Sequence, residues 1–169
     1  MKNFPDSYYL TLLSHIFTKK EAAELVSDLR NFNRELYETK KDFAEKLSEN
    51  LTEGQQEKIL KLRDILNLEI EKPEVFNELV DGLDAYIDQI AEITVHTARG
   101  LPQKTIQKIG LWFENNLNRK VIIDSQVDQS LIGGAIIASQ GKQFDNSVKS
   151  KLNKAFEQGF FKLTNLPYE

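Results

Sequence analysis

The sequence contains no cysteine, which excludes disulfide bonds, thiolate metal ligands and thiol redox chemistry within the chain. Residues that break helices are also scarce, with 4 prolines and 8 glycines among 169 residues. No apolar run approaches the length needed to span a membrane, and residues 1–17 lack the unbroken apolar core of a signal peptide. We therefore expect a chain rich in helix, without direct membrane insertion.

An excess of positive charge is absent as well. The 22 Lys and Arg are interleaved with 26 Asp and Glu, so that the formal net charge is -4 and the pI is near 5.4. Such a chain has no general electrostatic attraction to phosphate backbones, and we expect no nucleic-acid partner. With 40% hydrophobic and 28% charged residues, the composition is that of a folded protein of one ordinary domain or two small lobes.

The first half of the chain carries repeated signals for amphipathic helices. Apolar residues recur at spacings of three and four positions, most regularly between Ala22 and Leu36. Signals for helix N-termini stand at Asp6 or Ser7, at the capping-box pairs Thr18 with Glu21 and Thr52 with Gln55, and at Pro73. Short connections between helices favour antiparallel packing. Residues 1–91 are therefore predicted to form an antiparallel bundle of four or five helices.

The second half, residues 92–169, begins with a change of pattern. Alternating β-branched residues predict a strand over 93–98, and Pro102 begins an amphipathic helix. Further strands are expected at 120–124, 134–139 and 142–144, with a turn at Gln140-Gly141 and a last helix marked by Val148, Leu152, Ala155, Phe156 and Leu163. A helix between the first two strands allows them to pair in parallel. The predicted fold class is α+β, mainly α, with a small mixed-sheet α/β lobe after the bundle.

Gly133 and Gly134 do not fit a nucleotide site. A dinucleotide fingerprint connects a strand to a helix, whereas these glycines lead into a strand. We interpret them as a bulge or a close approach of two backbone segments. The sequence Asp145-Asn146-Ser147 precedes a predicted helix and is interpreted as its N-terminal cap.

Candidate residues for catalysis are few. His15 and His96 lie far apart in the sequence, and neither has a carboxylate at metal-ligand spacing. The carboxylates of Asp124, Asp128 and Asp145 lack a recognisable partner base, so an acid-base hydrolase is the weakest of the hypotheses. We expect no catalytic residue, no metal and no cofactor.

An ordered series of motifs extends from Glu92 to Phe156. After the strand ITVHTA and the strand KVIID come Val127-Asp128, Leu131-Ile132-Gly133-Gly134, Ile136-Ile137 and Phe144-Asp145-Asn146-Ser147. This series resembles the delta subunit of rotary ATP synthases, called the oligomycin-sensitivity-conferring subunit in mitochondria. That family usually has a glycine between the aspartate and the serine, where this chain has Asn146, and both residue types suit positive φ. The N-terminal half resembles the family in being a helical bundle, with Tyr8 and Leu12 at matching positions.

The resemblance implies a non-catalytic stator subunit of an F-type ATP synthase, which supports proton-driven ATP synthesis. One copy would link the catalytic head to the peripheral stalk, with the bundle binding N-terminal segments of the alpha subunits and the C-terminal lobe binding b-type stalk subunits. Its implied location is the cytoplasmic side of the bacterial inner membrane, as a peripheral protein. The alternative is a free-standing helical adaptor or regulatory module that binds another helical partner.

Candidate contact residues are apolar positions that exceed the needs of one narrow core stripe. On the first and last bundle helices they are Tyr8, Tyr9, Leu12, Leu13, Phe76, Val80, Leu83 and Ile87, for which core packing is the alternative. Phe160 and Phe161 near the C-terminus would contact the stalk or pack back on the sheet. The residues Leu131, Ile132, Gly133, Gly134, Asp145, Asn146 and Ser147 are assigned a structural role.

Overall fold

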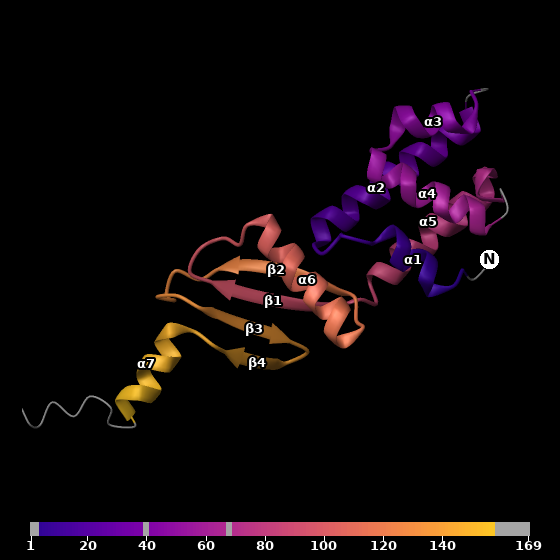
Figure 1. Ribbon diagram of the computed structural model, residues 1–169. Helices are drawn as coiled ribbons and strands as arrows, with labels where there is room; N and C mark the ends of the chain where they lie inside the picture. The colour runs from indigo at the N-terminus through magenta and orange to yellow at the C-terminus, as the bar shows by residue number, and fades with distance from the viewer. Residues whose placement is uncertain (1–3, 39–40, 67–68, 158–169) are drawn as a thin grey trace, which may run out of the picture.

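A computed structural model describes residues 4–38, 41–66 and 69–157 of the chain. It shows a helical bundle and a sheet-containing lobe placed end to end, with the last helix at the end farthest from the bundle (Figure 1). The predicted fold class, α+β and mainly α with a small mixed sheet, is confirmed.

Among the described residues, five α-helices and one 3-10 turn form the bundle. They are α1 (Asp6–Leu12), α2 (Lys19–Glu38), α3 (Phe43–Asn50), α4 (Glu53–Ile65), η1 (Glu69–Glu71) and α5 (Pro73–Ile87). The capping box before α2 is confirmed, because the Glu21 backbone N–H donates to Thr18 Oγ1 at 3.2 Å and the Thr18 N–H donates to Glu21 Oε2 at 3.1 Å. A second capping box starts α4, and Pro73 opens α5 as expected.

The four-residue spacing of Tyr8, Leu12 and Ile16 predicts a first helix that includes Ile16, but the helix is shorter. It ends at Leu12, and Ile16 lies in the following connection, where His15 has a φ of 63°. A left-handed residue in this position turns the chain away from the helix axis. The connection between α1 and α2 therefore takes its own path toward the sheet.

The bundle core is centred on aromatic side chains from three helices. Phe32 of α2 has no exposed surface, and its ring centroid lies 5.7 Å from that of Phe43 and 5.1 Å from that of Phe76. Both ring pairs have the edge-to-face geometry that aromatic rings favour. The long apolar stripe of α2 is thus buried against α3 and α5.

The second lobe is a four-stranded sheet with the order β2-β1-β3-β4. Its strands are β1 (Ala91–Thr97), β2 (Val121–Val127), β3 (Ala135–Ser139) and β4 (Lys142–Asp145). β1 and β2 pair in parallel through the crossover helix α6 (Gln103–Leu117), and the other pairs are antiparallel. The mixed sheet is confirmed, as is the turn at Gln140 and Gly141, where both residues have positive φ.

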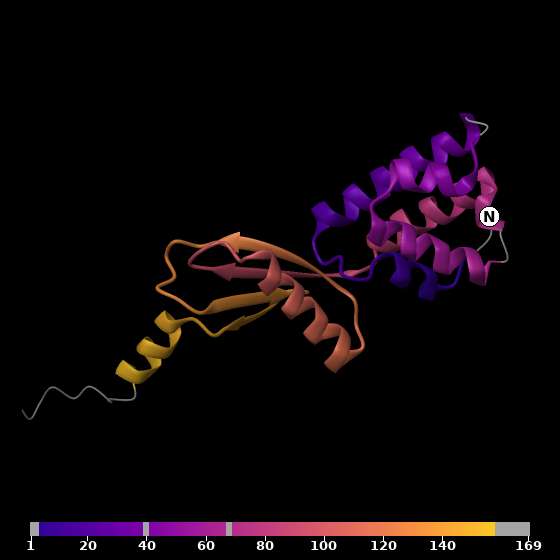
Figure 2. The same ribbon diagram turned by 45° about the horizontal axis from the view of Figure 1, so that its top comes forward.

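The helix α6 crosses one face of the sheet, and α7 (Val148–Glu157) extends beyond it (Figure 2). Between α6 and the sheet lies a second, smaller core of Ile93, Val95, Ile106, Val121, Ile123 and Phe17. Phe17 comes from the connection between α1 and α2, so the bundle sequence contributes a side chain to the core of the other lobe. The division into domains 1–91 and 92–169 stays a prediction for this reason.

Candidate partner-binding surfaces

Most of the expected contact residues on α1 and α5 are core residues. Exposure is 7% or less for Tyr9, Leu12, Leu13, Phe76, Val80 and Leu83. A side chain buried to this degree reaches a surface partner only if the bundle repacks, so these six side chains have the core role that was the alternative. Tyr8 and Ile87 are half-buried at the edge of the same core.

Close packing of α1 on α5 explains the burial. A Cβ added to Gly82 of α5 would lie 2.2 Å from the hydroxyl oxygen of Tyr9, so the glycine makes room for this side chain. The Tyr9 ring also lies 5.2 Å from the ring of Tyr86. Burial, followed by the nearby Asp6 carboxylate, raises the pKa of the Tyr9 phenol. Little of the facing surfaces of these two helices is left for a partner.

A hollow of about 320 Å³ lies beside the same helix pair, and Asn118, Arg119 and Lys120 border it from the α/β lobe. On the bundle side it is lined by Leu10, which is 41% exposed, and by Tyr86 and Ile90. We call these three residues the α1–α5 surface. Spacing alone did not identify Leu10, because it lies on the face of α1 opposite to the apolar stripe.

A separate groove lies between α2 and α5. Ala22, Ala23 and Val26 line it from α2 and Ile87 from α5, in a volume of about 290 Å³. Acidic side chains of Asp84, Asp88 and Glu92 stand around it. We call this the α2–α5 groove, and Ile122 of β2 also lines it, so that it borders the α/β lobe.

The two motif segments of the C-terminal lobe meet in space. The Val148 N–H donates to the Gly133 carbonyl at 2.9 Å, and the Asn146 N–H donates to the Ala135 carbonyl at 3.0 Å. Gly134 has a φ of +77°, and a Cβ there would lie 2.6 Å from the Asn146 carbonyl oxygen. The predicted close approach of two backbone segments is therefore confirmed.

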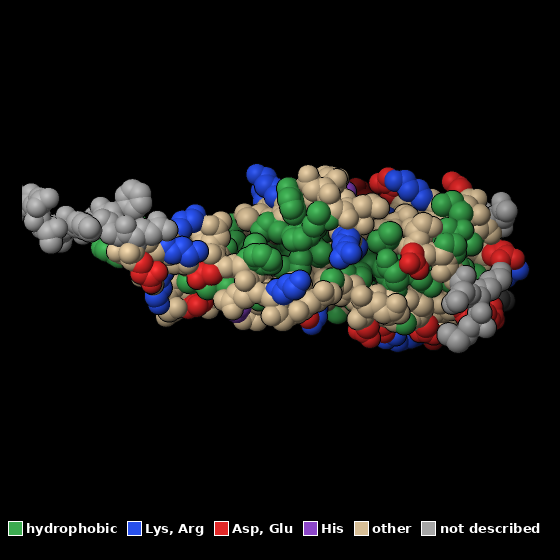
Figure 3. Space-filling view, turned by 90° about the horizontal axis from the view of Figure 1, so that it is seen from below, with side chains coloured by type: hydrophobic (Ala, Val, Ile, Leu, Met, Phe, Trp, Pro, Cys, Tyr) green, Lys and Arg blue, Asp and Glu red, His purple; other side chains and the backbone are tan. Residues whose placement is uncertain are grey.

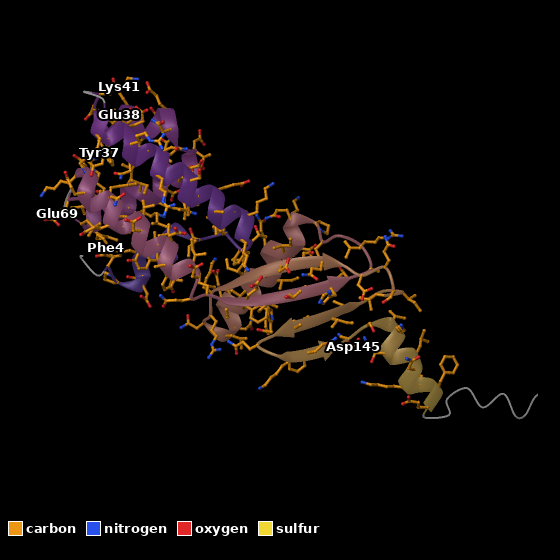
Figure 4. All side chains as sticks on the ribbon, turned by 180° about the vertical axis from the view of Figure 1, so that it is seen from behind. Phe4, Tyr37, Glu38, Lys41, Glu69 and Asp145 are labelled. Carbon is orange, nitrogen blue, oxygen red and sulfur yellow. The ribbon has the colours of Figure 1, made fainter. Side chains whose placement is uncertain are left out.

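The cap before α7 is confirmed at Ser147, which is 1% exposed. Its Oγ accepts a hydrogen bond from the Ser150 N–H at 3.1 Å. Asp145 at the end of β4 (Figure 4) in turn accepts from the Ser147 N–H at 2.9 Å, and hydrogen bonds from Ser147 lower the pKa of its carboxyl. Asn146 does not use the left-handed conformation, because positive φ occurs among the described non-glycine residues only at His15, Asn118 and Gln140.

Of the remaining motif residues, Leu131 is buried and Ile132 is 71% exposed. The helix α7 has no buried residue among those described. Its apolar side chains follow one face at a spacing of four, with exposures of 38% for Val148, 37% for Leu152 and 61% for Phe156. We call this stripe the α7 surface. Phe160 and Phe161 lie outside the described residues.

Hydrophobic side chains also gather over the sheet lobe on the face seen in Figure 3. Phe144 of β4 is 69% exposed and pairs with Ile137 of β3, which packs against the second core. Phe144 therefore lies on the face of the sheet that α6 covers, at an edge that α6 does not reach. The lobe thus carries exposed apolar side chains both on α7 and along β4.

The carboxylates considered for hydrolysis have local hydrogen-bond partners. Asp124 Oδ2 accepts from the Gln126 side chain at 2.6 Å, and Asp128 Oδ1 accepts from the Ser130 N–H at 2.9 Å. Among the described residues, no group of three His, Asp or Glu side chains could hold a metal ion. Within the same ranges, no helix is long and apolar enough to cross a membrane.

These features define a two-lobed protein with exposed apolar side chains on helix surfaces, on a sheet edge and in the connection between β2 and β3. Comparison with known families gives a more specific result: residues 7–158 match the family model for the ATP synthase delta (OSCP) subunit. The chain belongs to this family, and the resemblance noted in the sequence is confirmed.

Individual relatives agree with the family. Proteins named ATP synthase subunit delta are 35% identical over 82 residues in Histophilus somni (strain 2336) and 37% identical over 82 residues in Actinobacillus succinogenes. Another, from Thermosipho melanesiensis, is 35% identical over 68 residues. These alignments cover 48%, 48% and 40% of this chain, and 44%, 46% and 38% of the relatives. The chain thus spans less than half the length of the curated relatives it matches.

Proposed function

We propose that this chain is a non-catalytic stator subunit of an F-type ATP synthase, which links the catalytic head to the peripheral stalk during proton-driven ATP synthesis. The observation that carries the proposal is the placement of the exposed apolar surfaces. The α1–α5 surface lies on the bundle beside its junction with the α/β lobe, whereas the α7 surface lies at the end of that lobe farthest from the bundle (Figure 1). A linking protein needs two such surfaces, far enough apart for two partners to bind at once.

The bundle is assigned to the head. Its partner would be an amphipathic N-terminal segment of an alpha subunit, lying as a helix on the α1–α5 surface. Leu10 is exposed there and Tyr86 is half-buried, and apolar and aromatic side chains of this kind dominate binding energy when a partner covers them. The α2–α5 groove is the alternative position for the same segment.

The C-terminal lobe is assigned to the stalk. The apolar stripe of α7 has the spacing with which one helix packs against another, and b-type stalk subunits would supply the second helix. Slow dissociation under load calls for packed apolar contacts, and the first residue of α7 is tied to the lobe by the hydrogen bond from the Val148 N–H to the Gly133 carbonyl. One copy would serve each complex, as a peripheral protein on the cytoplasmic side of the bacterial inner membrane.

The first test is affinity purification of the tagged chain from gently solubilised native membranes, with mass spectrometry and an ATP hydrolysis assay of the eluate. Recovery of alpha, beta and b-type subunits in an ATP-hydrolysing complex is expected. Recovery of another helical partner without them, under conditions that keep the synthase intact, would establish the adaptor alternative.

Matched variants assign each surface. Leu152→Ser on the α7 surface is expected to lower recovery of b-type subunits by about tenfold or more, because it removes an apolar anchor. Lys151→Ser, next to Leu152 but outside the apolar stripe of α7, should leave recovery unchanged. Leu10→Asp should reduce binding of the alpha segment, whereas Ala23→Asp would do so only if that segment lies in the α2–α5 groove. Equal loss of both partners in Leu152→Ser would contradict the assignment of α7.

A further inference from the structure

Phe17 belongs to the bundle in sequence and to the α/β lobe in space. Its side chain has no exposed surface and packs with apolar residues of β1, β2 and α6. The residue stands between α1 and α2, only two positions before the first residue of α2. A residue from the bundle sequence is therefore packed inside the other lobe.

The α/β lobe is shaped to receive the ring. A Cβ added to Gly110 of α6 would lie 2.1 Å from Phe17 Cδ1, so only a glycine lets the helix approach the ring this closely. On another side, Lys120 Nζ lies 3.9 Å from the ring centroid, within the range of a cation–π contact. The Lys120 side chain is 4% exposed and is paired with Glu114 at 2.8 Å. These contacts hold the ring between α6 and the start of β2.

The backbone of the same segment is bound on both sides. The Ile123 N–H of β2 donates to the Phe17 carbonyl at 2.6 Å. On the bundle side, Glu21 Oε2 accepts from the Phe17 N–H at 3.0 Å. Lys58 Nζ of α4 donates to the carbonyls of Leu12 and Ser14 at 2.9 and 2.7 Å, which fixes the start of the connection. The segment can leave the α/β lobe only by breaking a sheet-side hydrogen bond as well as the ring contacts.

The polar side-chain ties between the lobes are exposed. Lys19 pairs with Glu92 at 2.7 Å, but the two side chains are 69% and 40% exposed, and ion pairs in such positions contribute little. Gln103 of α6 also donates to Glu21, likewise at an exposed position. The apolar packing across the junction thus comes from the Phe17 ring and from Ile122 of β2, which is 2% exposed and lines a hollow together with Ala22 and Val26 of α2.

We propose that Phe17 is an inter-lobe lock, a side chain that joins the helical bundle and the α/β lobe into one rigid and cooperatively folding body. The lock is a property of the isolated chain and does not depend on the proposed function. In a stator, it would prevent bending between the surface bound to the head and the surface bound to the stalk.

Spin labels can test the lock directly, because the chain has no native cysteine to interfere. Labels at Ser48→Cys on α3 and Gln143→Cys on β4 report the distance between the lobes through double electron–electron resonance, since both positions are exposed. The parent chain should give one narrow distance distribution. Phe17→Ala should broaden it, and Gly110→Ala should do the same from the other side by displacing the ring.

Gly54→Ala is the matched control for Gly110→Ala. It makes the same change inside a helix, at a position where a Cβ would meet nothing within 4 Å. Its distance distribution should stay narrow. A narrow distribution in folded Phe17→Ala or Gly110→Ala would overturn the lock.

A second readout covers the case in which Phe17→Ala does not fold. Phe17→Leu keeps an apolar side chain but loses the ring contacts, and the Ile123 amide reports whether the segment is still bound. Exchange of this amide should become about tenfold faster or more if the junction opens locally. Unchanged exchange at Ile123, with the lobe folded, would also overturn the proposal.

Discussion

The helical bundle and the α/β lobe differ in how completely they cover their apolar side chains. Among the described residues, 18 buried residues form the bundle core, whereas the second core has six, one of which is Phe17 from the bundle sequence. The lobe meanwhile leaves Phe144, Ile132 and Phe156 more than 60% exposed. A lobe this small buries little apolar surface by itself. A residue supplied by the bundle, and a partner that covers the exposed edge, therefore add to its stability.

The largest expected effect lies in the bundle core. Phe32→Ala removes a fully buried ring between two others and should lower the free energy of unfolding by about 3–5 kcal/mol. Phe144→Ala, on the exposed edge of the lobe, should change it by less than about 0.5 kcal/mol. Urea denaturation of both variants measures the contrast, and similar losses would mean that the lobe edge is covered within the chain.

The next effect concerns the junction between β3 and α7. Gly134→Ala should destabilise the lobe by more than about 1 kcal/mol, because the residue has positive φ and its Cβ would meet the Asn146 carbonyl. Gly141→Ala is the matched control, since φ is +75° there and nothing lies within 4 Å. Thermal unfolding of the two variants separates backbone strain from the close contact. Equal losses would show that the approach of Asn146 does not matter.

A smaller effect should appear at alkaline pH. Burial lowers the pKa of Lys120, and burial followed by the charge of Lys120 lowers the pKa of Lys58. Between the lowered pKa and the ordinary value near 10.5, the unfolded chain binds more protons, so these groups make stability rise with pH. Lys120→Gln should reduce this rise. Urea titrations between about pH 8 and about pH 10, where lysines with lowered pKa lose their protons, measure the free energy of unfolding of both proteins. An identical pH dependence in the two proteins would contradict the shifts.

The smallest effect is expected at Asp145. Its carboxyl pKa is lowered by hydrogen bonds from Ser147, so its contribution is present above the ordinary pKa of 3.8 and is lost as pH falls through the folded value. Asp145→Asn keeps one acceptor oxygen and should cause a slight loss at neutral pH that vanishes in acid. The melting temperatures of both proteins at neutral and acid pH provide the check. A loss that persists in acid would point to geometry instead of charge.

Local signals in the sequence predicted local structure well. The capping boxes at Thr18 and Thr52, the turn at Gln140 and the cap at Ser147 each depend on residues within a few positions, and all are confirmed. The contact residues on α1 and α5 could not be separated from core residues by spacing, because a helix inside a bundle is covered on more than one side.

The role of Phe17 lay beyond such signals. It is a single apolar residue in a connection, and nothing in its spacing indicates that Gly110, far along the chain, leaves room for its ring. The exposure of a side chain in a helical stripe could not be predicted from the sequence either. Leu152 and Leu12 are the same residue type in similar stripes, yet Leu152 is 37% exposed and Leu12 is fully buried. Whether a stripe is buried depends on which helix or strand packs against it, and the residues of the stripe do not indicate that element.

The most direct test of the linking role is assembly from purified parts. The catalytic head without its delta-type subunit and a soluble segment of the b-type stalk would be mixed with this chain, and the masses of the complexes measured by native mass spectrometry. We expect an assembly of head, chain and stalk segment with one copy of the chain, which does not form when the chain is omitted. Binding of head and stalk segment that is mutually exclusive, or binding of neither, would contradict it.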